Sequence, residues 1–310
     1  MNEIFERIAI VGAGAIGLYY GGRLAAAGED LHFLVRSDYE GLSQRGLKCE
    51  SVHGDFELPD PQLYRNSAEI GPVDLVIVTW KATANEHLAQ VLPPLLHDQT
   101  RVLTLQNGLG NCEAIAAIIG PERVLGGLCF VCINRMEAGR IVHSGGGKVS
   151  IGSWHPQSAS HAQTVTALMR AAGIKAHHVD RLEQAQWEKL IWNIPFNGLS
   201  VAEGGVTTDV LLADPARVDE IRALMMEVIA TANALGLELD EALAEDNIER
   251  TRPMGAYRTS SMIDFVEGRE VELGPIWEEP IRRAREIGVP MPGVEALFDL
   301  IRAQLAMRQD

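Results

Sequence analysis

The sequence predicts an α/β fold class, with a doubly wound parallel sheet in the N-terminal part and an all-α C-terminal part. Residues 7–38 read as a short apolar strand, a glycine-rich turn, a helix and a second strand, which is the order of a parallel βαβ unit. From residue 181 onward, strand-like runs give way to apolar residues at helical spacings of three and four. We therefore expect two domains, residues 1–180 and residues 181–310.

Composition excludes several classes of function. Lys and Arg total 27 against 42 Asp and Glu, and the resulting formal charge of −15 repels nucleic acid and anionic membrane surfaces. No apolar run approaches the roughly 20 residues that span a bilayer, and the first residues include acids where a signal peptide is basic. The histidines and cysteines show no metal-ligand spacing, so no metal site is predicted. We expect a cytoplasmic protein that acts on a small molecule.

A glycine-rich turn follows the first expected strand and fits the pattern G-x-G-x-x-G. In such a turn Gly12 makes the tight bend, Gly14 lets the backbone approach a pyrophosphate, and Gly17 lets the helix pack on the strand. Amide groups at the start of the helix then face the phosphates. The context predicts a Rossmann-type domain that binds a dinucleotide. The residues expected to contact the cofactor here are Gly12, Ala13, Gly14, Ala15, Ile16 and Gly17.

The end of the second strand, "FLVRSD", favours NADP as the cofactor. Arg36 stands near the position where NAD-binding proteins have an acid that binds the ribose 2′-hydroxyl. A guanidinium there pairs with a 2′-phosphate. Asp38 follows two residues later, and it keeps NAD open as an alternative.

Two further expected strands end in polar residues. "VDLVIVTWKA" runs into Lys81, and "TRVLTLQNGLGN" runs into Asn107. Because ligands bind outside the carboxyl ends of the strands in a doubly wound sheet, Lys81 and Asn107 are expected to line one crevice with Arg36. A surface lysine and a turn asparagine are the simpler alternatives.

Residues 123–152 predict antiparallel strands that extend the sheet. The apolar stretches are separated at residues 137–139 and again at the glycines 145–147. His143 lies on the middle stretch, where a structural histidine is favoured over a proton donor.

The segment "WEKLIWNIPFNGLSV", residues 187–201, carries a polar stripe within an apolar sequence. Lys189, Asn193 and Asn197 are spaced by four, so a helix places them on one face. Burying an ammonium and two amides is costly without polar partners, and this predicts a ligand on that face. A lysine that reaches solvent and two helix-bending amides are the alternative.

The remaining C-terminal sequence predicts helices. A helix is expected at residues 214–235, with Asp214 as cap and Pro215 in the first turn, and its apolar length is compatible with a homodimer. Two more helices are expected on either side of the prolines at 290 and 292. Ser260 and Ser261 read alone as the N-cap of another helix.

A lysine on a buried stripe suits the reduction of a ketone. Hydride transfer from NADPH leaves negative charge on the carbonyl oxygen, which requires a proton donor such as Lys189. Neutral hydrogen bonds from the asparagines would hold the hydroxyl or carboxylate groups of the substrate. An acid such as Glu272 would hold the ammonium, although the sequence does not place the two together.

The motifs "VGAGAIGLYYGGRLA", "QNGLGN", "WEKLIWNIPFNGLS" and "SSMIDFVEGREVE", together with Arg36, resemble those of ketopantoate reductases (2-dehydropantoate 2-reductases) in order over nearly the whole chain. The resemblance implies NADPH-dependent reduction of ketopantoate to pantoate on the route to coenzyme A. It also implies the site residues. Lys189 and Glu272 are then catalytic, with Glu272 also in contact with the substrate.

The other matches follow in the same way. The resemblance assigns Asn193, Asn197 and one of Ser260 and Ser261 to the substrate. It assigns Lys81 and Asn107 to the region of the nicotinamide and the substrate, and Arg36 to the 2′-phosphate.

The chain departs from the family in two places. It has Ala84 and Asn85 where a glutamine is frequent, and the stretch from Ser261 to Glu272 is one residue shorter than usual. The choice between the two serines therefore stays open. Two alternative functions also stay open: a reductase of another 2-oxo acid, and a dinucleotide sensor without catalysis.

Overall fold

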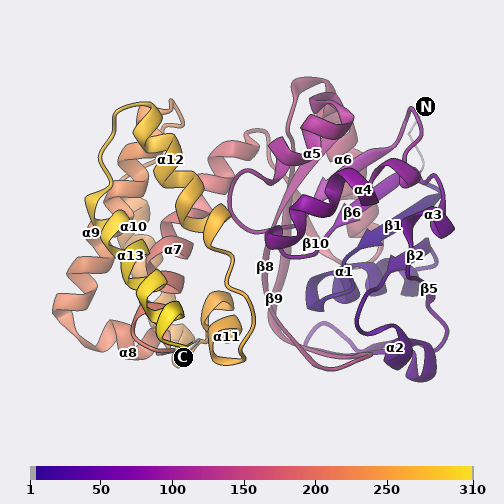
Figure 1. Ribbon diagram of the computed structural model, residues 1–310, viewed down its shortest axis with the longest axis horizontal. Helices are drawn as coiled ribbons and strands as arrows, with labels where there is room; N and C mark the ends of the chain where they lie inside the picture. Colours follow the sequence, from indigo (N-terminus) through magenta and orange to yellow (C-terminus); the bar gives the residue numbers. More distant parts are fainter. Residues whose placement is uncertain (1–4, 309–310) are drawn as a thin grey trace. The chain divides into compact units, whose positions relative to one another are not determined.

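The computed structural model describes residues 5–308 and divides the chain into two compact units, Met1–Leu182 and Glu183–Asp310 (Figure 1). Within the described range, the first unit contains every strand and the second unit is helical. The mixed α/β class and the helical C-terminal part are as predicted. None of the helices in the described range is long and apolar enough to cross a membrane.

One sheet organises the first unit. Over residues 5–182 its strands follow the order β4-β3-β9-β8-β7-β6-β1-β2-β5, and β10 lies beside β9. The strands are β1 (Arg7–Val11), β2 (Asp30–Leu34), β3 (Leu47–Ser51), β4 (Phe56–Leu58), β5 (Gln62–Tyr64), β6 (Leu75–Val78), β7 (Arg101–Thr104), β8 (Val124–Glu137), β9 (Arg140–Ser153) and β10 (Lys175–His178).

The helices of this unit connect and cover the strands. They are α1 (Ala15–Ala26), α2 (Tyr39–Arg45), α3 (Ser67–Ile70), α4 (Leu88–Val91), α5 (Asn111–Ile119) and α6 (Ala159–Ala171), with short 3₁₀ turns η1 (Ala82–His87), η2 (Pro93–Leu95), η3 (Pro121–Arg123) and η4 (Pro156–Ser158).

The strands β5, β2, β1, β6, β7 and β8 are neighbours in this order and run parallel. The chain moves from β1 to β2 and β5 on one side, and through β6, β7 and β8 on the other, so the order reverses beside β1. Both faces are covered, which explains why β6, "LVIV", is apolar and buried at every position. In such a sheet, ligands bind outside the carboxyl ends of the strands at the point of reversal.

The β8–β9 hairpin differs from the expected series of short strands. Its two strands are antiparallel and 14 residues long, and β9 continues through the glycines at 145–147. The register shifts between Phe130 and Val131 and again between Cys132 and Ile133. Gly146 has a φ of 72°, and a Cβ there would meet the Phe130 carbonyl oxygen at 2.4 Å. The glycines therefore form irregularities within one strand and do not end it.

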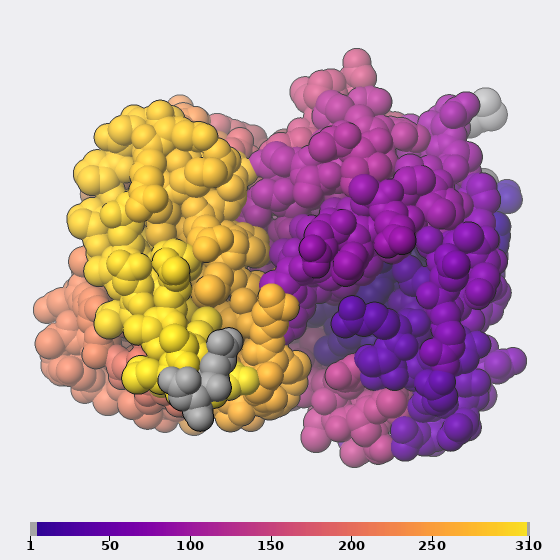
Figure 2. Space-filling view, in the orientation of Figure 1, coloured from indigo at the N-terminus to yellow at the C-terminus, as the bar shows by residue number. Residues whose placement is uncertain are grey.

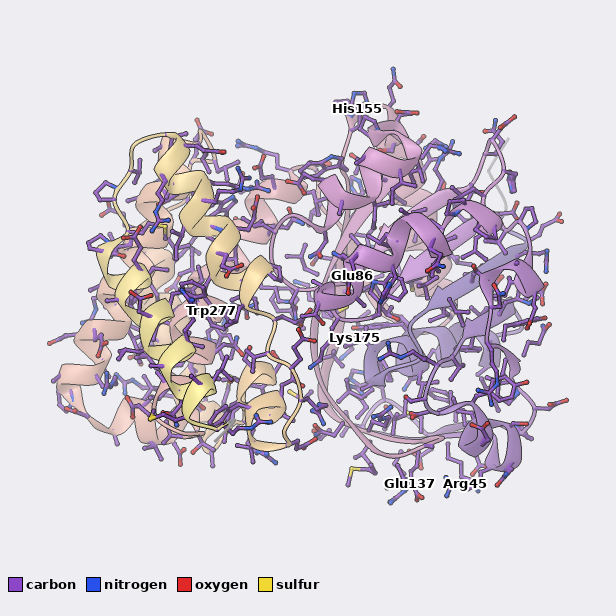
Figure 3. The ribbon with its side chains drawn as sticks, in the orientation of Figure 1. Arg45, Glu86, Glu137, His155, Lys175 and Trp277 are labelled. Atoms are coloured by element: carbon purple, nitrogen blue, oxygen red, sulfur yellow. The ribbon has the colours of Figure 1, made fainter. Side chains whose placement is uncertain are left out.

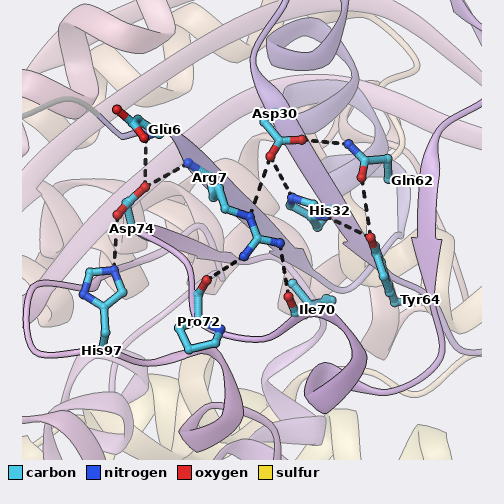
Figure 4. Close-up of polar contacts among 10 residues, drawn as sticks. All are labelled: Glu6, Arg7, Asp30, His32, Gln62, Tyr64, Ile70, Pro72, Asp74 and His97. Carbon is cyan, nitrogen blue, oxygen red and sulfur yellow. Dashed lines mark hydrogen bonds and ion pairs between the residues drawn. The ribbon is translucent and has the colours of Figure 1, made fainter.

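A polar network joins the amino ends of β1, β2 and β6 (Figure 4). The Asp74 carboxylate accepts the backbone N–H of Arg7 at 2.9 Å and lies 3.1 Å from His97 Nε2. The Asp30 carboxylate lies 3.7 Å from the Arg7 guanidinium and 3.0 Å from His32 Nε2. The glycine-rich turn leaves the other end of β1, so this network belongs to the stability of the sheet and not to a ligand site.

The second unit contains α7 (Leu182–Ala202, which begins at the last residue of the first unit), α8 (Thr208–Ala213), α9 (Pro215–Ala234), α10 (Ala242–Thr251), α11 (Ser260–Val266), α12 (Glu279–Glu286), α13 (Pro292–Met307), a 3₁₀ turn η5 (Arg252–Met254) and a π-turn η6 (Gly274–Glu278). In Figure 2 the yellow C-terminal helices cover the face of this unit that is turned toward the viewer.

The predicted ends of α9 are confirmed. Asp214 is its N-cap and accepts the backbone N–H of Ala216 at 3.0 Å, Pro215 is its first residue, and Gly236 follows it with a φ of 84°. Most of the large apolar residues of α9, including Ile221 and Met225, are buried inside the unit, whereas Ala223 and Ala230 are exposed. The buried side chains of α9 are therefore not available to a partner subunit.

Candidate functional site

The bend after β1 is held by contacts that the sequence did not indicate. Gly12 has a φ of 103°, and a Cβ there would lie 2.5 Å from the backbone nitrogen of Trp80. The hydroxyl of Thr79, at the end of β6, donates to the Gly12 carbonyl oxygen at 2.5 Å. Only glycine combines this conformation with this close approach, so β6 holds the turn in its shape.

The other two glycines of the motif have the environments that nucleotide binding requires. A Cβ on Gly17 would lie 2.2 Å from the Gly12 carbonyl oxygen, so α1 packs directly on the turn. A Cβ on Gly14 would meet nothing within 4 Å. Gly14 is the N-cap of α1, and the first turn of this helix carries no acid. The open space above Gly14 and the amide groups of α1 fit a pyrophosphate.

The remaining residues of the motif surround this opening. Ala13 is buried, whereas Ala15 and Ile16 are half-buried in the first turn of α1. Arg36 follows β2, which pairs in parallel with β1, and its side chain is exposed. Over residues 5–308, Arg36 has no hydrogen bond or ion pair, so its guanidinium is available to a ligand.

Lys81 and Asn107 follow β6 and β7, and both are half-buried. The strands β2, β1, β6 and β7 are parallel neighbours, so their carboxyl ends all lie at the same end of the sheet. Each of these strands is followed by one predicted site residue: Gly12 after β1, Arg36 after β2, Lys81 after β6 and Asn107 after β7. All four therefore lie at the carboxyl ends of the strands, as predicted from the sequence.

A network of hydrogen bonds that involves several side-chain amides connects the loops at the carboxyl ends of β6 and β7. Asn85 Oδ1 accepts hydrogen bonds from Trp80 Nε1 at 3.2 Å and from Gln106 Nε2 at 2.8 Å. Asn85 Nδ2 donates to Asn111 Oδ1 at 2.9 Å, and Asn111 Nδ2 donates to the Asn107 carbonyl oxygen at 2.9 Å. The network ties the loop after β6 to the loop after β7.

The contacts of Asn85 and Asn111 are not predicted from the sequence. The available signal in the sequence is the three amide residues of "QNGLGN", whereas "WKATAN" contains Asn85 alone.

His143 has the structural role that the sequence favoured. Its side chain is 1% exposed, Nε2 lies 2.9 Å from the Gly145 carbonyl oxygen, and Nδ1 lies 2.8 Å from Ser51 Oγ. A carbonyl oxygen only accepts, so Nε2 carries the proton and Nδ1 accepts from Ser51. Burial lowers the pKa of His143, and the nearby His53, Arg23 and Lys175 lower it further.

The polar stripe of α7 is present as predicted. Lys189, Asn193 and Asn197 lie within one continuous helix, which also passes through Pro195. Lys189 is half-buried, while Asn193 is 6% exposed and Asn197 is 1% exposed. The surrounding residues of the helix, from Leu190 to Val201, are buried apart from Trp192.

Asn197 contacts the start of α11. Its Oδ1 accepts the backbone N–H of Ser261 at 3.0 Å and the hydroxyl of Ser260 at 3.3 Å. This oxygen is therefore occupied, and the amide nitrogen is the group that remains for a ligand. The structure brings both serines to the polar stripe, although 63 and 64 residues separate them from Asn197.

The two serines are not the N-cap of α11. Thr259 has this role, and its hydroxyl oxygen accepts the backbone N–H of Met262 at 3.3 Å. Ser260 and Ser261 form the first turn, where Ser260 is exposed and Ser261 is buried. A threonine caps as a serine does, so the local sequence allowed either assignment. Glu272 lies between α11 and η6, and its carboxylate side chain is buried, with 9% exposure of the residue.

Comparisons with known proteins agree with these features. The family described as "Ketopantoate reductase PanE/ApbA" matches residues 8–156, and "Ketopantoate reductase PanE/ApbA C terminal" matches residues 181–305. A 2-dehydropantoate 2-reductase from Nostoc sp. is 39% identical over 307 residues, which cover 97% of this chain and 95% of the relative.

Solved structures show the same relationship. The crystal structure of 2-dehydropantoate 2-reductase from Geobacter metallireducens has a TM-score of 0.93 and 44% identity, covering 96% of this chain and 99% of that one. A D-mandelate dehydrogenase solved with NADH and anilino(oxo)acetate has a TM-score of 0.90 at 23% identity, covering 98% of this chain and 100% of that one. The latter likeness shows the fold alone. The two family matches and the extent of the Nostoc and Geobacter similarities show that this chain belongs to the ketopantoate reductase family.

Proposed function

We propose that this protein reduces 2-dehydropantoate (ketopantoate) to pantoate with NADPH, a step on the route to coenzyme A. The observation that carries this proposal is the polar stripe of Lys189, Asn193 and Asn197 on α7, in a chain of the ketopantoate reductase family. This helix is buried from Leu190 to Val201 apart from Trp192. A purely structural helix gains nothing from a half-buried ammonium beside two buried amides.

The first unit, residues 1–180 in our assignment, is proposed to bind the cofactor. NADPH, when bound, supplies the hydride. The opening at Gly14 and the amide groups of α1 receive the pyrophosphate, and the exposed guanidinium of Arg36 pairs with the 2′-phosphate. Lys81 and Asn107 are assigned to the nicotinamide and substrate end of the site, where the amide network from Asn85 would hold their loops in place.

The helical unit, residues 181–310 in our assignment, is proposed to bind the substrate and move the proton. Reduction of a ketone leaves negative charge on its oxygen, and the Lys189 ammonium stabilises this charge and donates a proton to it. Glu272 orients this ammonium and accepts a hydrogen bond from a substrate hydroxyl. A carboxylate with both tasks keeps the proton donor aligned with the substrate.

The two amides of α7 and the serines of α11 are proposed to hold the 2-oxo acid. Asn193 and the amide nitrogen of Asn197 donate to its oxygens, because Asn197 Oδ1 is already bound to the start of α11. Ser260 and Ser261 complete the set. These asparagines and serines carry no formal charge. They can therefore bind the hydroxyl and carboxylate groups of the substrate without placing a second cation beside Lys189.

The proposal is tested by following the consumption of NADPH with ketopantoate, beside NADH and a panel of other 2-oxo acids. We expect turnover with ketopantoate and preference for NADPH. Turnover with another oxo acid only would keep the mechanism and change the substrate. Binding of NADPH without turnover of any oxo acid would contradict the proposed activity and favour a sensor.

The role of Lys189 is tested by Lys189→Ala, with Lys48→Ala as the control. We expect Lys189→Ala to lower kcat by a factor of about 10²–10⁴, which is the usual range for general acid catalysis, and to leave the affinity for NADPH unchanged. Lys48 is an exposed lysine of β3, 3.2 Å from Glu57, and its replacement should leave turnover intact. Normal turnover by Lys189→Ala would refute the mechanism.

A further inference from the structure

Two acidic residues follow Arg36 closely, and each is paired with an arginine from another part of the first unit. Asp38 forms an ion pair with Arg135 of β8, and its Oδ1 accepts the Ser37 hydroxyl at 3.1 Å. Glu40 forms an ion pair with Arg65, which follows β5. Both acids are therefore neutralised by partners distant in sequence.

The pairing of Asp38 occupies its carboxylate. Asp38 is the N-cap of α2, but its side chain makes no cap hydrogen bond, because the oxygens are used by Ser37 and Arg135. The Asp38 side chain is 13% exposed and that of Arg135 is 39% exposed, so the carboxylate is more shielded from water than its partner.

Arg36 differs from the two arginines that neutralise the acids. Its side chain is exposed, and within residues 5–308 it has no partner. The protein carries a formal charge of −15, which repels anions at long range. An anionic group therefore approaches the end of β2 only where cations neutralise the nearby carboxylates. The two ion pairs leave one guanidinium available beside the end of β2.

The hairpin that carries Arg135 is anchored on α2 at several points. Arg45 of α2 lies 3.0 Å from Glu137 of β8, and both are labelled close together in Figure 3. A Cβ on Gly41 would meet the Cβ of Ala138 at 2.4 Å, which reflects close packing of the hairpin turn against α2. The length of β8 therefore places Arg135 beside Asp38.

We propose that Arg135 is a specificity-determining residue that favours NADPH over NADH by neutralising Asp38. The inference rests on the proposed function, in which the 2′-phosphate binds at Arg36. A free carboxylate at the end of the second strand accepts the 2′-hydroxyl of NADH and repels the 2′-phosphate of NADPH. With Arg135 in place, the aspartate carries no uncompensated charge, and Arg36 determines the preference.

The inference is tested by calorimetry with NADP⁺ and NAD⁺ on the full chain, and by the ratio of kcat/KM for NADPH to that for NADH. Arg135→Gln removes the guanidinium that neutralises Asp38. The preference for the phosphorylated cofactor should then fall by about tenfold or more, in binding as in turnover. Adding Asp38→Asn to this variant removes the freed carboxylate, and the preference should return to within about threefold of the wild type.

Two single variants separate charge from structure. Arg45→Ala removes the neighbouring ion pair between α2 and the hairpin but leaves Asp38 masked, so the preference should not change. Asp38→Asn alone leaves the Arg135 guanidinium without its partner, so the preference for the phosphorylated cofactor should rise by about threefold or more, and an unchanged preference would count against the role of Arg135. This variant keeps the inference testable if Arg135→Gln does not fold.

The outcomes distinguish the inference from the proposed function. Three results would overturn the specificity role of Arg135. The first is that Arg135→Gln loses affinity for both cofactors equally, and the second is that Arg45→Ala lowers the preference for the phosphorylated cofactor as much as Arg135→Gln does. The third result is that adding Asp38→Asn to Arg135→Gln does not restore this preference. Wild-type protein that binds NADP⁺ no more tightly than NAD⁺ would overturn the cofactor assignment and this inference together. Wild-type protein that prefers NADP⁺ but reduces no oxo acid would refute the proposed reaction, while the binding ratios would still decide the role of Arg135.

Discussion

The opening at Gly14 predicts a variant that loses the cofactor without losing stability. A Cβ at Gly14 meets no atom within 4 Å, and the residue has φ −79° and ψ −171°, which alanine adopts freely. Gly14→Ala removes backbone entropy from the unfolded chain, worth about 0.4–1 kcal/mol, and weakens the N-cap by a similar amount. The free energy of unfolding should therefore stay nearly unchanged.

The affinity of Gly14→Ala for NADPH, unlike its free energy of unfolding, should fall. The methyl group would stand where the pyrophosphate approaches the backbone, so that at least one hydrogen bond from an amide to a phosphate oxygen lengthens or breaks. Such a bond to a charged group contributes about 1.5–3 kcal/mol, which corresponds to a loss of about 10- to 100-fold in the affinity for NADPH. Calorimetry with NADPH measures this loss, and thermal unfolding of the same samples without cofactor measures stability.

Gly17→Ala is the matched comparison. Its Cβ would lie 2.2 Å from the Gly12 carbonyl oxygen and 2.5 Å from Thr79 Oγ1, so the turn or the helix must move. Overpacking of this kind costs about 1–3 kcal/mol and should lower Tm by several degrees. If Gly14→Ala bound NADPH as tightly as the wild type, or was destabilised as much as Gly17→Ala, the assignment of the opening to the pyrophosphate would be wrong.

Three further predictions concern stability and the amide network. Glu227 accepts the backbone N–H groups of Gly293 and Val294, both at 2.9 Å, so Glu227→Ala should lower the free energy of unfolding by about 1–3 kcal/mol in a urea titration, and Glu227→Gln by less. Asn85→Ala and Asn111→Ala should each weaken NADPH binding, and the double variant should show less than the sum of the two effects; additive losses would argue against one network. The pKa values of His53 and His143 are lowered, first by burial and then by nearby positive charge, so the folded state disfavours their protonation. Their contribution to stability is present above the unfolded histidine pKa of about 6.5 and is lost as pH falls through the lower folded values. His143→Gln should flatten this decline in the urea midpoint below pH about 6.5, and an unchanged slope would refute the attribution.

The sequence by itself determined the features that depend on residues close together in the chain. The glycines at 12, 14 and 17 predicted the turn because a bend of a few residues admits few side chains. The spacing of Lys189, Asn193 and Asn197 predicted a polar stripe because helical geometry places every fourth residue on nearly the same face. The cap at Asp214 was predictable for the same reason, since a helix end is a local arrangement of backbone groups.

The tertiary structure decided which distant groups meet. Thr79 holds the Gly12 turn from 67 residues away, and Arg135 masks Asp38 from 97 residues away. Neither partner carries a local signal, because a hydroxyl or a guanidinium is favourable in many exposed places. Likewise, β9 continues through its glycines because the partner strand supplies hydrogen bonds on both sides of the register shifts. The arginine at residue 36 could be identified from its position after a strand, but its availability for a ligand depends on pairings that only the folded sheet brings together.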